Sequence, residues 1–263
     1  MSSLKYDAHA HVFHPKIAAK ATQQLYDYYR IPPAGDGTLA GLLTGLRAAG
    51  LDRAVAHCAA TTPAQVVLAN DWAIHLQSVP EIEAFGTFHP DFAAWEKEFD
   101  RLAAAGVRGL KLHPDFQKIW LDDPQLSPMF EAAAGRFVMM FHIGDERRPD
   151  ENFSSPQKLA AIKRRFPQLT MIAAHLGGYL HWRHVVEAFA GLEIFVDTSS
   201  ALPFIDDDLL TEIRLNIPLD RWLFGSDFPL AMPATEIGLV KKRLQLNARE
   251  FDELLTRAGQ FFA

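Results

Sequence analysis

Hydrophobic and polar positions along the chain follow two alternating periods. Short runs rich in β-branched and aromatic residues, typical of buried strands, are separated by longer segments in which apolar residues recur with the period of a helix. From the second strand on, successive strands start 24 to 32 residues apart, the length of one strand, one helix and two loops. The expected strands span residues 5–9, 53–58, 82–88, 107–112, 137–142, 169–174, 193–197 and 221–226.

The segments between these strands predict helices with recognisable ends. Gly50 and Gly106 each follow an apolar helical run, as glycines that end helices do, and Ser155 with Pro156 begins one with an N-cap and a first-turn proline. The first interval is longer than the others and has room for an additional helix at 17–30. The expected helices span residues 17–30, 38–49, 63–78, 92–105, 124–136, 155–166, 179–190, 205–216, 235–244 and 247–262.

The repeated strand and helix unit predicts the fold class. No glycine- or serine-rich linker divides the chain, and the strand and helix period is its sole repeat. We therefore expect residues 1–263 to form one domain, an α/β fold of the (β/α)8 TIM-barrel type. An open, doubly wound sheet is the alternative.

Composition and charge exclude several classes of protein. Of the 263 residues, 49% are apolar and 22% are charged, which allows a sizeable core and excludes a disordered chain. The 26 Lys and Arg residues against 32 Asp and Glu residues give a net charge of -6, and no long basic run is present. Nucleic acid is therefore not an expected partner.

The single cysteine and the lack of long apolar stretches predict where the protein resides. Cys58 cannot form an intrachain disulfide, which fits a reducing compartment, and we expect it to be a small buried hydrophobic residue. The first residues lack the basic start and apolar stretch of a signal peptide, and no window approaches the roughly 18 apolar residues of a membrane helix. We expect a cytoplasmic protein without a membrane partner; a homo-oligomer stays open.

Most of the predicted strands end in a side chain that could bind a metal or transfer a proton. In a (β/α)8 barrel the carboxyl ends of the strands meet at one rim, where the chemistry of such enzymes takes place. One histidine at a strand end is more often a hydrogen-bonded structural residue, but so many at one rim indicate a site. The set comprises His9, His11, His57, His89, Lys111, His113, His142, His175, Asp197 and Asp227.

The clearest pair is His9 and His11 in the first strand. Residues two apart on a strand point to the same face, about 6 to 7 Å from each other, so both imidazoles can face one ion while Ala10 packs outward. The same phase puts Asp7 on the inward side. Two histidines at this spacing are common by chance, and their place in the first strand strengthens the prediction.

Three further strand ends complete a candidate metal site. His142 ends an apolar run in the fifth strand, and His175 follows the sixth strand just before two glycines that allow a close approach of the backbone. Asp227 ends an apolar strand, where a carboxylate needs a cation beside it. Imidazoles with a carboxylate suit zinc, with iron and manganese as alternatives.

Taken together, these residues resemble the amidohydrolase superfamily. The resemblance is closest to its amidohydrolase-2 branch of TIM-barrel enzymes, which includes aminocarboxymuconate-semialdehyde decarboxylase-like proteins, and Gly109-Leu-Lys-Leu-His-Pro114 is similar to its fourth-strand segment. The resemblance implies a single divalent ion, most simply zinc, held by His9, His11, His142 and Asp227. It implies that His175 is the catalytic imidazole or a further ligand, and that Asp227 is also catalytic.

Lys111 leaves the number of metal ions open. In binuclear members of the superfamily a fourth-strand lysine is carbamylated and bridges two ions, and Lys111 lies on that strand in phase with His113. As an ordinary ammonium it would instead bind a substrate carboxylate. We also expect His113 and His57 to contact substrate, and Arg147 either to clamp an anionic substrate or to be solvated.

The function that this site predicts is hydrolysis of an amide, ester or lactone of a small molecule. Asp227 would take the proton of an activated water, and His175 would polarise the scissile carbonyl. A non-oxidative decarboxylase of an unsaturated or aromatic carboxylic acid is the first alternative, and a catalytically silent ligand-binding barrel is the second. The expected partner is a small molecule that can carry a carboxylate.

Overall fold

The computed structural model describes residues 3–57 and 59–262, so the expectation for Cys58 falls outside the described residues. Eight parallel strands form one sheet in which each strand pairs with the next along the chain. They are β1 (Tyr6–His11), β2 (Arg53–His57), β3 (Ile82–Thr87), β4 (Gly109–Leu112), β5 (Val138–Phe141), β6 (Thr170–Ala173), β7 (Phe195–Asp197) and β8 (Trp222–Leu223).

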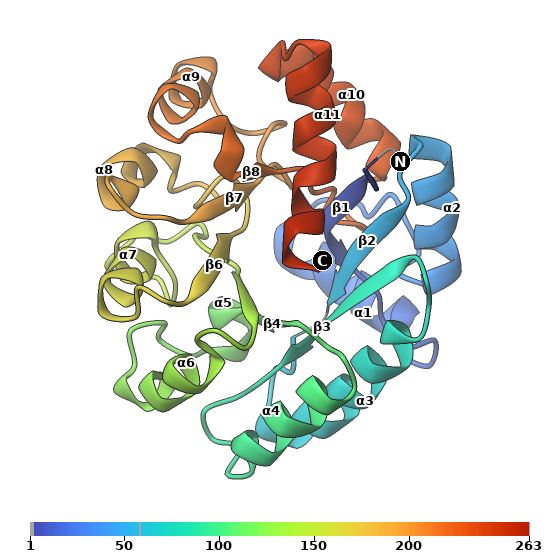
Figure 1. Cartoon of the computed structure of the whole chain (residues 1–263), viewed down its shortest axis with the longest axis vertical. Coiled ribbons are helices and arrows are strands. Elements are labelled where there is room, and N and C mark those ends of the chain that lie inside the picture. The colour runs from blue at the N-terminus through green and yellow to red at the C-terminus, as the bar shows by residue number, and fades with distance from the viewer. Residues whose placement is uncertain (1–2, 58, 263) are drawn as a thin grey trace.

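Contacts between the first and last strands close this sheet into a barrel. The Ala8 amide donates to the Phe224 carbonyl at 2.7 Å. Further along, the His11 amide donates to the Phe228 carbonyl at 2.6 Å. Figure 1 shows the strands inside a ring of helices. The predicted (β/α)8 barrel is confirmed, and the open-sheet alternative is wrong because its edge strands would not meet.

The helices occupy the connections between strands, and the additional helix predicted between the first two strands is present as α1. None of the described helices is long and apolar enough to cross a membrane. The α-helices are α1 (Ala18–Tyr29), α2 (Leu39–Ala49), α3 (Val66–Gln77), α4 (Trp95–Ala104), α5 (Pro114–Gln117), α6 (Ser127–Ala133), α7 (Pro156–Arg165), α8 (Val185–Phe189), α9 (Asp207–Asn216), α10 (Pro233–Leu244) and α11 (Ala248–Thr256). The 3-10 turns are η1 (Pro63–Gln65), η2 (Pro124–Leu126), η3 (Trp182–His184), η4 (Leu219–Arg221) and η5 (Arg257–Phe261).

Two connections near the rim differ from the prediction. The helix expected at 179–190 is reduced to η3 and α8, because Leu180 has a left-handed φ of 59° that interrupts the helix. The short α5 was not predicted. It forms because Pro114 starts its first turn and the His113 ring accepts a hydrogen bond from the Phe116 amide at 3.3 Å, capping the helix.

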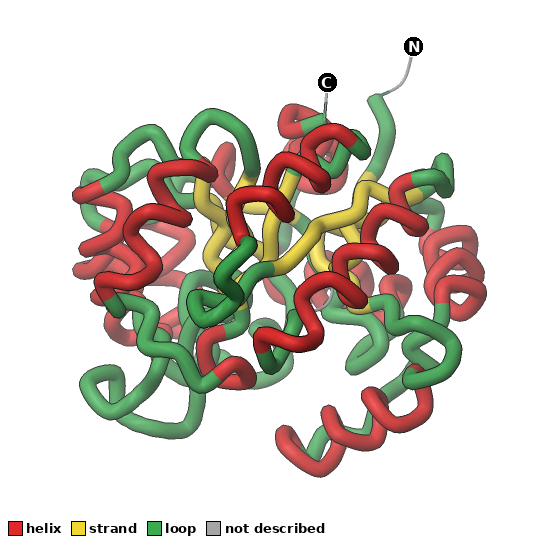
Figure 2. Tube along the Cα trace, turned by 90° about the horizontal axis from the view of Figure 1, so that it is seen from below, coloured by secondary structure: helices red, strands yellow, loops and turns green. Residues whose placement is uncertain are grey.

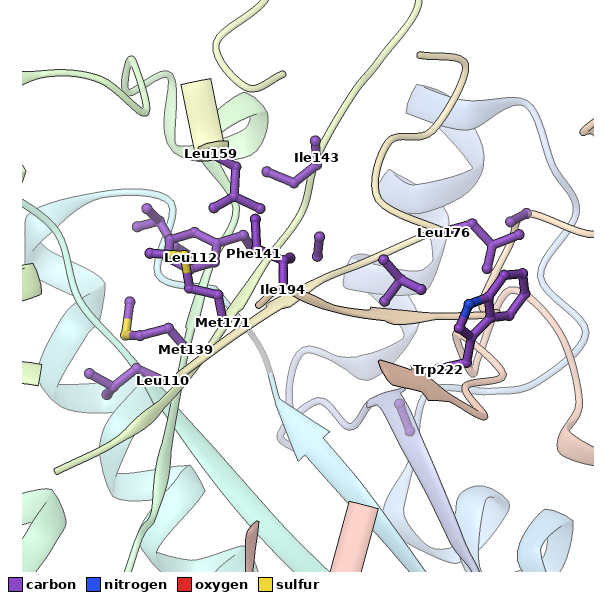
Figure 3. Close-up of a cluster of buried hydrophobic side chains, with 14 of the residues drawn as sticks. Leu110, Leu112, Met139, Phe141, Ile143, Leu159, Met171, Leu176, Ile194 and Trp222 are labelled. Carbon is purple, nitrogen blue, oxygen red and sulfur yellow. The ribbon is translucent and has the colours of Figure 1, made fainter. Parts of the chain in front are cut away.

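Apolar side chains form two cores, one on each face of the barrel wall. The outer core joins strand residues such as Met139 and Met171 to helix residues such as Leu159 of α7, as Figure 3 shows. The inner core consists of strand residues on the opposite phase, including Val138 and Met140. Strands buried on both faces explain why their sequences are continuous apolar runs.

Leu159 offers a direct test of the outer core. Its side chain is fully buried, so Leu159→Ala removes apolar contacts and leaves a cavity, and we expect a loss of about 2 to 5 kcal/mol in the free energy of unfolding. Urea denaturation measures this loss. Leu215→Ala on α9 is the matched control, because Leu215 is 81% exposed, and it should change the free energy of unfolding by less than about 0.5 kcal/mol.

An irregularity in β1 sets which of its side chains face the interior. Tyr6 and Ala8 belong to the inner core, and the pairing with β2 shifts register between Asp7 and Ala10. Such a bulge reverses the alternation, so His9 follows Ala8 into the interior. The expectation that Asp7 shares the phase of the histidines is therefore wrong, and its carboxylate accepts hydrogen bonds from the amide and hydroxyl of Ser226.

The two ends of the barrel are closed by different segments. At the end where the strands begin, Ala258 of η5 joins the inner core, with Phe261 and Phe262 packed against it. Helix α11 passes in front of the strands in Figure 1, whereas α1 lies behind them, and Figure 2 shows both termini on one side. The carboxyl ends of the strands, with α1 over them, therefore form the opposite rim.

Candidate metal centre

Two histidines of β1 and an aspartate after β8 bring three potential ligand atoms together. The Nε2 atom of His9 lies 3.3 Å from Nε2 of His11, and both nitrogens lie 3.3 Å from Oδ1 of Asp227. Two ligands of a tetrahedral ion, each at about 2.0 to 2.1 Å, are separated by about 3.3 to 3.4 Å. The three atoms therefore form a triangle of the size that a divalent ion requires.

Asp197, the last residue of β7, determines which nitrogen of His9 faces this triangle. Its Oδ2 atom accepts a hydrogen bond from His9 Nδ1 at 2.9 Å, which puts the ring proton on Nδ1 and leaves a lone pair on Nε2. Burial, and next the ammonium of Lys111, lowers the pKa of His9 to about 4, so the ring is neutral. In metal sites, a carboxylate that accepts a hydrogen bond from one ring nitrogen of a histidine orients the other ring nitrogen toward the metal.

Asp227 reaches the triangle because the chain turns sharply after β8. The residue has a left-handed φ of 62°, and its amide donates to the His9 carbonyl at 2.8 Å. A Cβ atom at Gly225 would lie 2.8 Å from the Cβ of His9, so this approach of β8 to β1 requires glycine. The Ser200 hydroxyl donates to Asp227 Oδ2 at 2.6 Å, which leaves Oδ1 for the histidines.

The charge on Asp227 is favoured by the imidazoles around it. Burial acts to raise the pKa of this carboxyl. Positive charge on His9, present when that ring is protonated, and the hydrogen bond from the His11 ring outweigh burial and hold the pKa of Asp227 well below its ordinary value. The group is therefore an ionised carboxylate at neutral pH, as a metal ligand must be.

One ring nitrogen of His142 and one of His175 face each other, and each carries a lone pair. His142 Nε2 donates to the Gly144 carbonyl at 3.0 Å, and His175 Nδ1 donates to the Ser199 carbonyl at 2.9 Å. The remaining nitrogens, His142 Nδ1 and His175 Nε2, are only 3.0 Å apart. Two unprotonated nitrogens repel at this distance, so a proton or a metal ion has to lie between or beside them.

These atoms belong to one cluster that fits a divalent ion. Potential ligand atoms of His9, His175 and Asp227 lie within 4.8 Å of one another, and His142 contacts this group through His175. The backbone positions His175 with a left-handed φ of 61°, a conformation that costs a non-glycine residue about 1 to 3 kcal/mol. Neutral imidazoles with one carboxylate are ligands of zinc and also suit manganese.

Lys111 and His57 are buried beside the metal-binding cluster, and a ligand atom of His57 lies within 4.8 Å of those of His9 and His11. Lys111 is fully buried on β4, its ammonium has no hydrogen-bond partner among the described residues, and burial lowers its pKa to about 8. His57 on β2 stacks edge-on against His9 and His11, with ring centroids 4.7 and 4.6 Å apart. Neither residue lines the cavity at the rim.

A narrow cavity opens onto the metal-binding cluster, with a free volume of about 20 Å³. His113, predicted to contact substrate, lines it, whereas Arg147 is exposed and does not line it, and the His181 ring hydrogen-bonds to the Arg147 carbonyl. The polar wall consists of His11, His142, His175, Ser200 and Asp227. The remaining wall is apolar or aromatic and consists of Leu25, Tyr29, Ile31, Phe116, Tyr179 and Leu230.

Sequence reasoning missed the aromatic residues of this wall. Tyr29 comes from the end of α1 and Tyr179 from the loop after β6. The Tyr29 hydroxyl lies 3.3 Å from His113 Nε2, and the His113 ring stacks on His142 with centroids 3.9 Å apart. The sequence feature that could have placed Tyr29 near the cavity is the additional helix predicted at 17–30, because a helix inserted after the first strand of a barrel lies near the rim.

Structural comparison finds the same barrel in proteins of low sequence identity. The 5-carboxyvanillate decarboxylase of Sphingomonas paucimobilis is 16% identical with a TM-score of 0.70, and 99% of each chain is covered. An uncharacterised TIM-barrel protein of Bordetella bronchiseptica is 14% identical with a TM-score of 0.75, covering 99% of this chain and 98% of that one.

A third similar structure holds a metal ion. It is the 5-carboxyvanillate decarboxylase of Novosphingobium aromaticivorans, complexed with manganese and 4-hydroxy-3-methoxy-5-nitrobenzoic acid. The two chains are 15% identical with a TM-score of 0.70, covering 99% of this chain and 96% of that one. No curated protein sequence matches this chain. The sequence profile of one family, described as Amidohydrolase, matches residues 6–256, and the chain belongs to this amidohydrolase family.

Proposed function

We propose that this enzyme catalyses the metal-dependent, non-oxidative decarboxylation of a small aromatic or unsaturated carboxylic acid. The observation that carries the proposal is the narrow cavity, which joins the His9, His11 and Asp227 triangle to an aromatic wall. Planar rings pack well against such a wall. Structural similarity to the 5-carboxyvanillate decarboxylases supports the same reaction class. Decarboxylation, the first alternative that the sequence predicts, thus has better support than hydrolysis.

The proposed reaction breaks one carbon-carbon bond without an oxidant. The bond between the carboxylate and its carbon breaks, carbon dioxide leaves, and the electron pair of that bond takes up a proton to form a carbon-hydrogen bond. A bound divalent ion would hold the substrate and stabilise the negative charge that develops on it. We propose that His9, His11, His142 and Asp227 hold that ion.

His175 is the side chain proposed to move the proton. Its Nδ1 atom is engaged by the Ser199 carbonyl, so Nε2 is the atom that can hold the proton and hand it to the substrate carbon. Trp182 donates through Nε1 to the His175 carbonyl at 2.8 Å, which fixes the backbone of this residue.

Hydrolysis of an amide, ester or lactone is the second candidate, because the same histidines and carboxylate can serve it. Asp227 is a carboxylate beside the ring nitrogens of His9 and His11, where hydrolysis would use it to take the proton of a water. Hydrolysis also needs room for a water, an acyl group and its leaving group together. The free volume of about 20 Å³ holds about one water molecule and is too small for either kind of substrate, so turnover and not volume separates the two candidates.

Turnover of a small panel separates these two candidates. Protein loaded with zinc or with manganese is incubated with 2,6-dihydroxybenzoate and 5-carboxyvanillate, and separately with simple amides, esters and lactones. Decarboxylation releases carbon dioxide and takes up one proton for each acid consumed, and both are measured against protein stripped of metal. We expect carbon dioxide from at least one acid and no acyl cleavage. Acyl cleavage without carbon dioxide release would instead support the hydrolase.

A further inference from the structure

Asp7 is a buried carboxylate next to the metal-binding triangle, and none of the three triangle atoms belongs to it. Its side chain is fully buried, and the register of β1 against β2 shifts between Asp7 and Ala10, the stretch that contains His9. The proposed reaction does not use this carboxylate. Because a buried carboxylate is costly unless its oxygens accept hydrogen bonds, the groups that donate to it show what the residue does.

One oxygen of Asp7 joins the two segments that carry the triangle. Oδ1 accepts a hydrogen bond from the His9 amide at 3.1 Å and a second from the Ser226 amide at 2.9 Å. His9 is one corner of the triangle, and Ser226 directly precedes Asp227, another corner. A single atom therefore fixes the separation between the backbone of β1 and the backbone that follows β8.

The other oxygen of Asp7 holds the turn that presents Asp227. Oδ2 accepts a hydrogen bond from the Ser226 hydroxyl, and the oxygen of that hydroxyl accepts one from the Phe228 amide at 3.1 Å. Asp227 lies between these two residues with a left-handed φ of 62°. This conformation is costly for a residue other than glycine and persists only where neighbouring contacts hold it. The bonds of Ser226 and Phe228 are such contacts, and they converge on Asp7.

We propose that Asp7 is a positioning residue that sets the spacing of the metal ligands before the ion binds. It acts through the His9 amide and through Ser226, and it does not contact the ion. Ligands already held at the spacing of the ion lose less conformational freedom when the ion binds, so this role contributes to metal affinity. The inference rests on the metal centre of the proposed function, and it does not depend on which acid is decarboxylated.

A purely structural role for Asp7 predicts a different result. Loss of buried hydrogen bonds lowers the free energy of unfolding wherever the bonds lie, whereas only bonds that fix the triangle alter the metal affinity of the folded protein. Asn70 of α3 provides the comparison. Its side chain is also fully buried, and it bonds to the amide of Thr87 at 2.8 Å and to the Thr87 carbonyl at 3.0 Å, at the end of β3. No proposed ligand lies on β3.

The metal affinity of folded variants tests the proposal. Competition with a chromophoric chelator measures the dissociation constant of Co²⁺ for wild-type protein, Asp7→Asn, Ser226→Ala, their double variant and the control Asn70→Ala. Asp7→Asn replaces an acceptor oxygen with an NH₂ group, and Ser226→Ala removes the hydroxyl that donates to Asp7 Oδ2. We expect the dissociation constant to rise about 10- to 100-fold in Asp7→Asn, about 5- to 10-fold in Ser226→Ala and less than about twofold in Asn70→Ala.

The double variant tests whether Asp7 and Ser226 act through one bond. Both substitutions break the bond between the Ser226 hydroxyl and Asp7 Oδ2, so the double variant should bind Co²⁺ at least about twofold more tightly than the product of the two single effects requires. The visible ligand-field bands of bound Co²⁺ are a second readout, because they depend on the number and geometry of its ligands. We expect these bands to change in Asp7→Asn at saturating Co²⁺ and to stay the same in Asn70→Ala.

The outcomes separate this inference from the function on which it rests. Dissociation constants within about twofold of wild type in folded Asp7→Asn and Ser226→Ala, or an equal rise in Asn70→Ala, would overturn the positioning role and leave the metal centre intact. Circular dichroism shows whether each variant folds, and Ser226→Ala, which removes a single hydroxyl, decides the question if Asp7→Asn does not. Failure of the wild-type protein to bind Co²⁺, or binding that His9→Ala leaves unchanged, would overturn the metal centre itself.

Discussion

Alanine at His9 or at Asp227 is expected to abolish turnover and to release the bound ion. Each residue contributes one corner of the triangle with sides of 3.3 Å, and Asp227 also contributes its negative charge. Loss of an outer partner of a ligand costs about 10- to 100-fold in metal affinity, so loss of a ligand itself should cost more than about 100-fold. Elemental analysis after gel filtration, which reports moles of metal per mole of chain, measures the effect.

Two histidine variants serve as controls for this result. His89→Ala removes a buried imidazole that lies near Asp91 and has no contact with the triangle. This variant should leave the metal content unchanged. His57→Ala removes a ring whose ligand atom lies within 4.8 Å of those of His9 and His11; because His57 is not among the proposed ligands, this variant should retain the ion. Full metal occupancy in Asp227→Ala, or loss of metal in His57→Ala alone, would contradict the assignment.

Asparagine at His175 is expected to lower the turnover number by about 10² to 10⁴ while the metal stays bound. Asparagine retains a nitrogen that can donate to the Ser199 carbonyl, but it cannot take up a proton near neutral pH. The variant therefore reports proton transfer and not packing. The measurement is the turnover number of fully metal-loaded protein with the best acid of the panel, beside its metal content.

The result at His175 discriminates between two roles. If His175→Asn loses stoichiometric metal, the residue is a ligand, as its place within 4.8 Å of the His9 and Asp227 ligand atoms allows. A second ion, with carbamylated Lys111, would then need testing by the same elemental analysis. Turnover within a few-fold of wild type would remove His175 from the mechanism.

Much of the fold and the rim could be predicted from the sequence, because both follow from local periods. The strand and helix repeat requires a parallel sheet, and a parallel barrel brings all strand ends to one rim. His9, His11, His142, His175 and Asp227 were therefore predicted as neighbours without knowledge of any contact, and the structure brings them together.

Other features depend on contacts between distant segments. The bulge that turns Asp7 away from the site is a property of the pairing of β1 with β2, and strict alternation along β1 does not reveal it. Tyr29 enters the cavity because α1 lies over the rim, and helical periodicity does not say where a helix docks. Lys111 is on the expected strand, but its complete burial depends on the closed barrel around it, which local periodicity does not define.

Anomalous diffraction from a crystal of the zinc- or manganese-loaded protein locates the bound ion itself. We expect one peak at about 2.0 to 2.2 Å from Nε2 of His9, Nε2 of His11 and Oδ1 of Asp227. A peak elsewhere, for instance between His57 and Lys111 in the barrel interior, or a fully loaded sample without a peak at the triangle, would contradict this expectation.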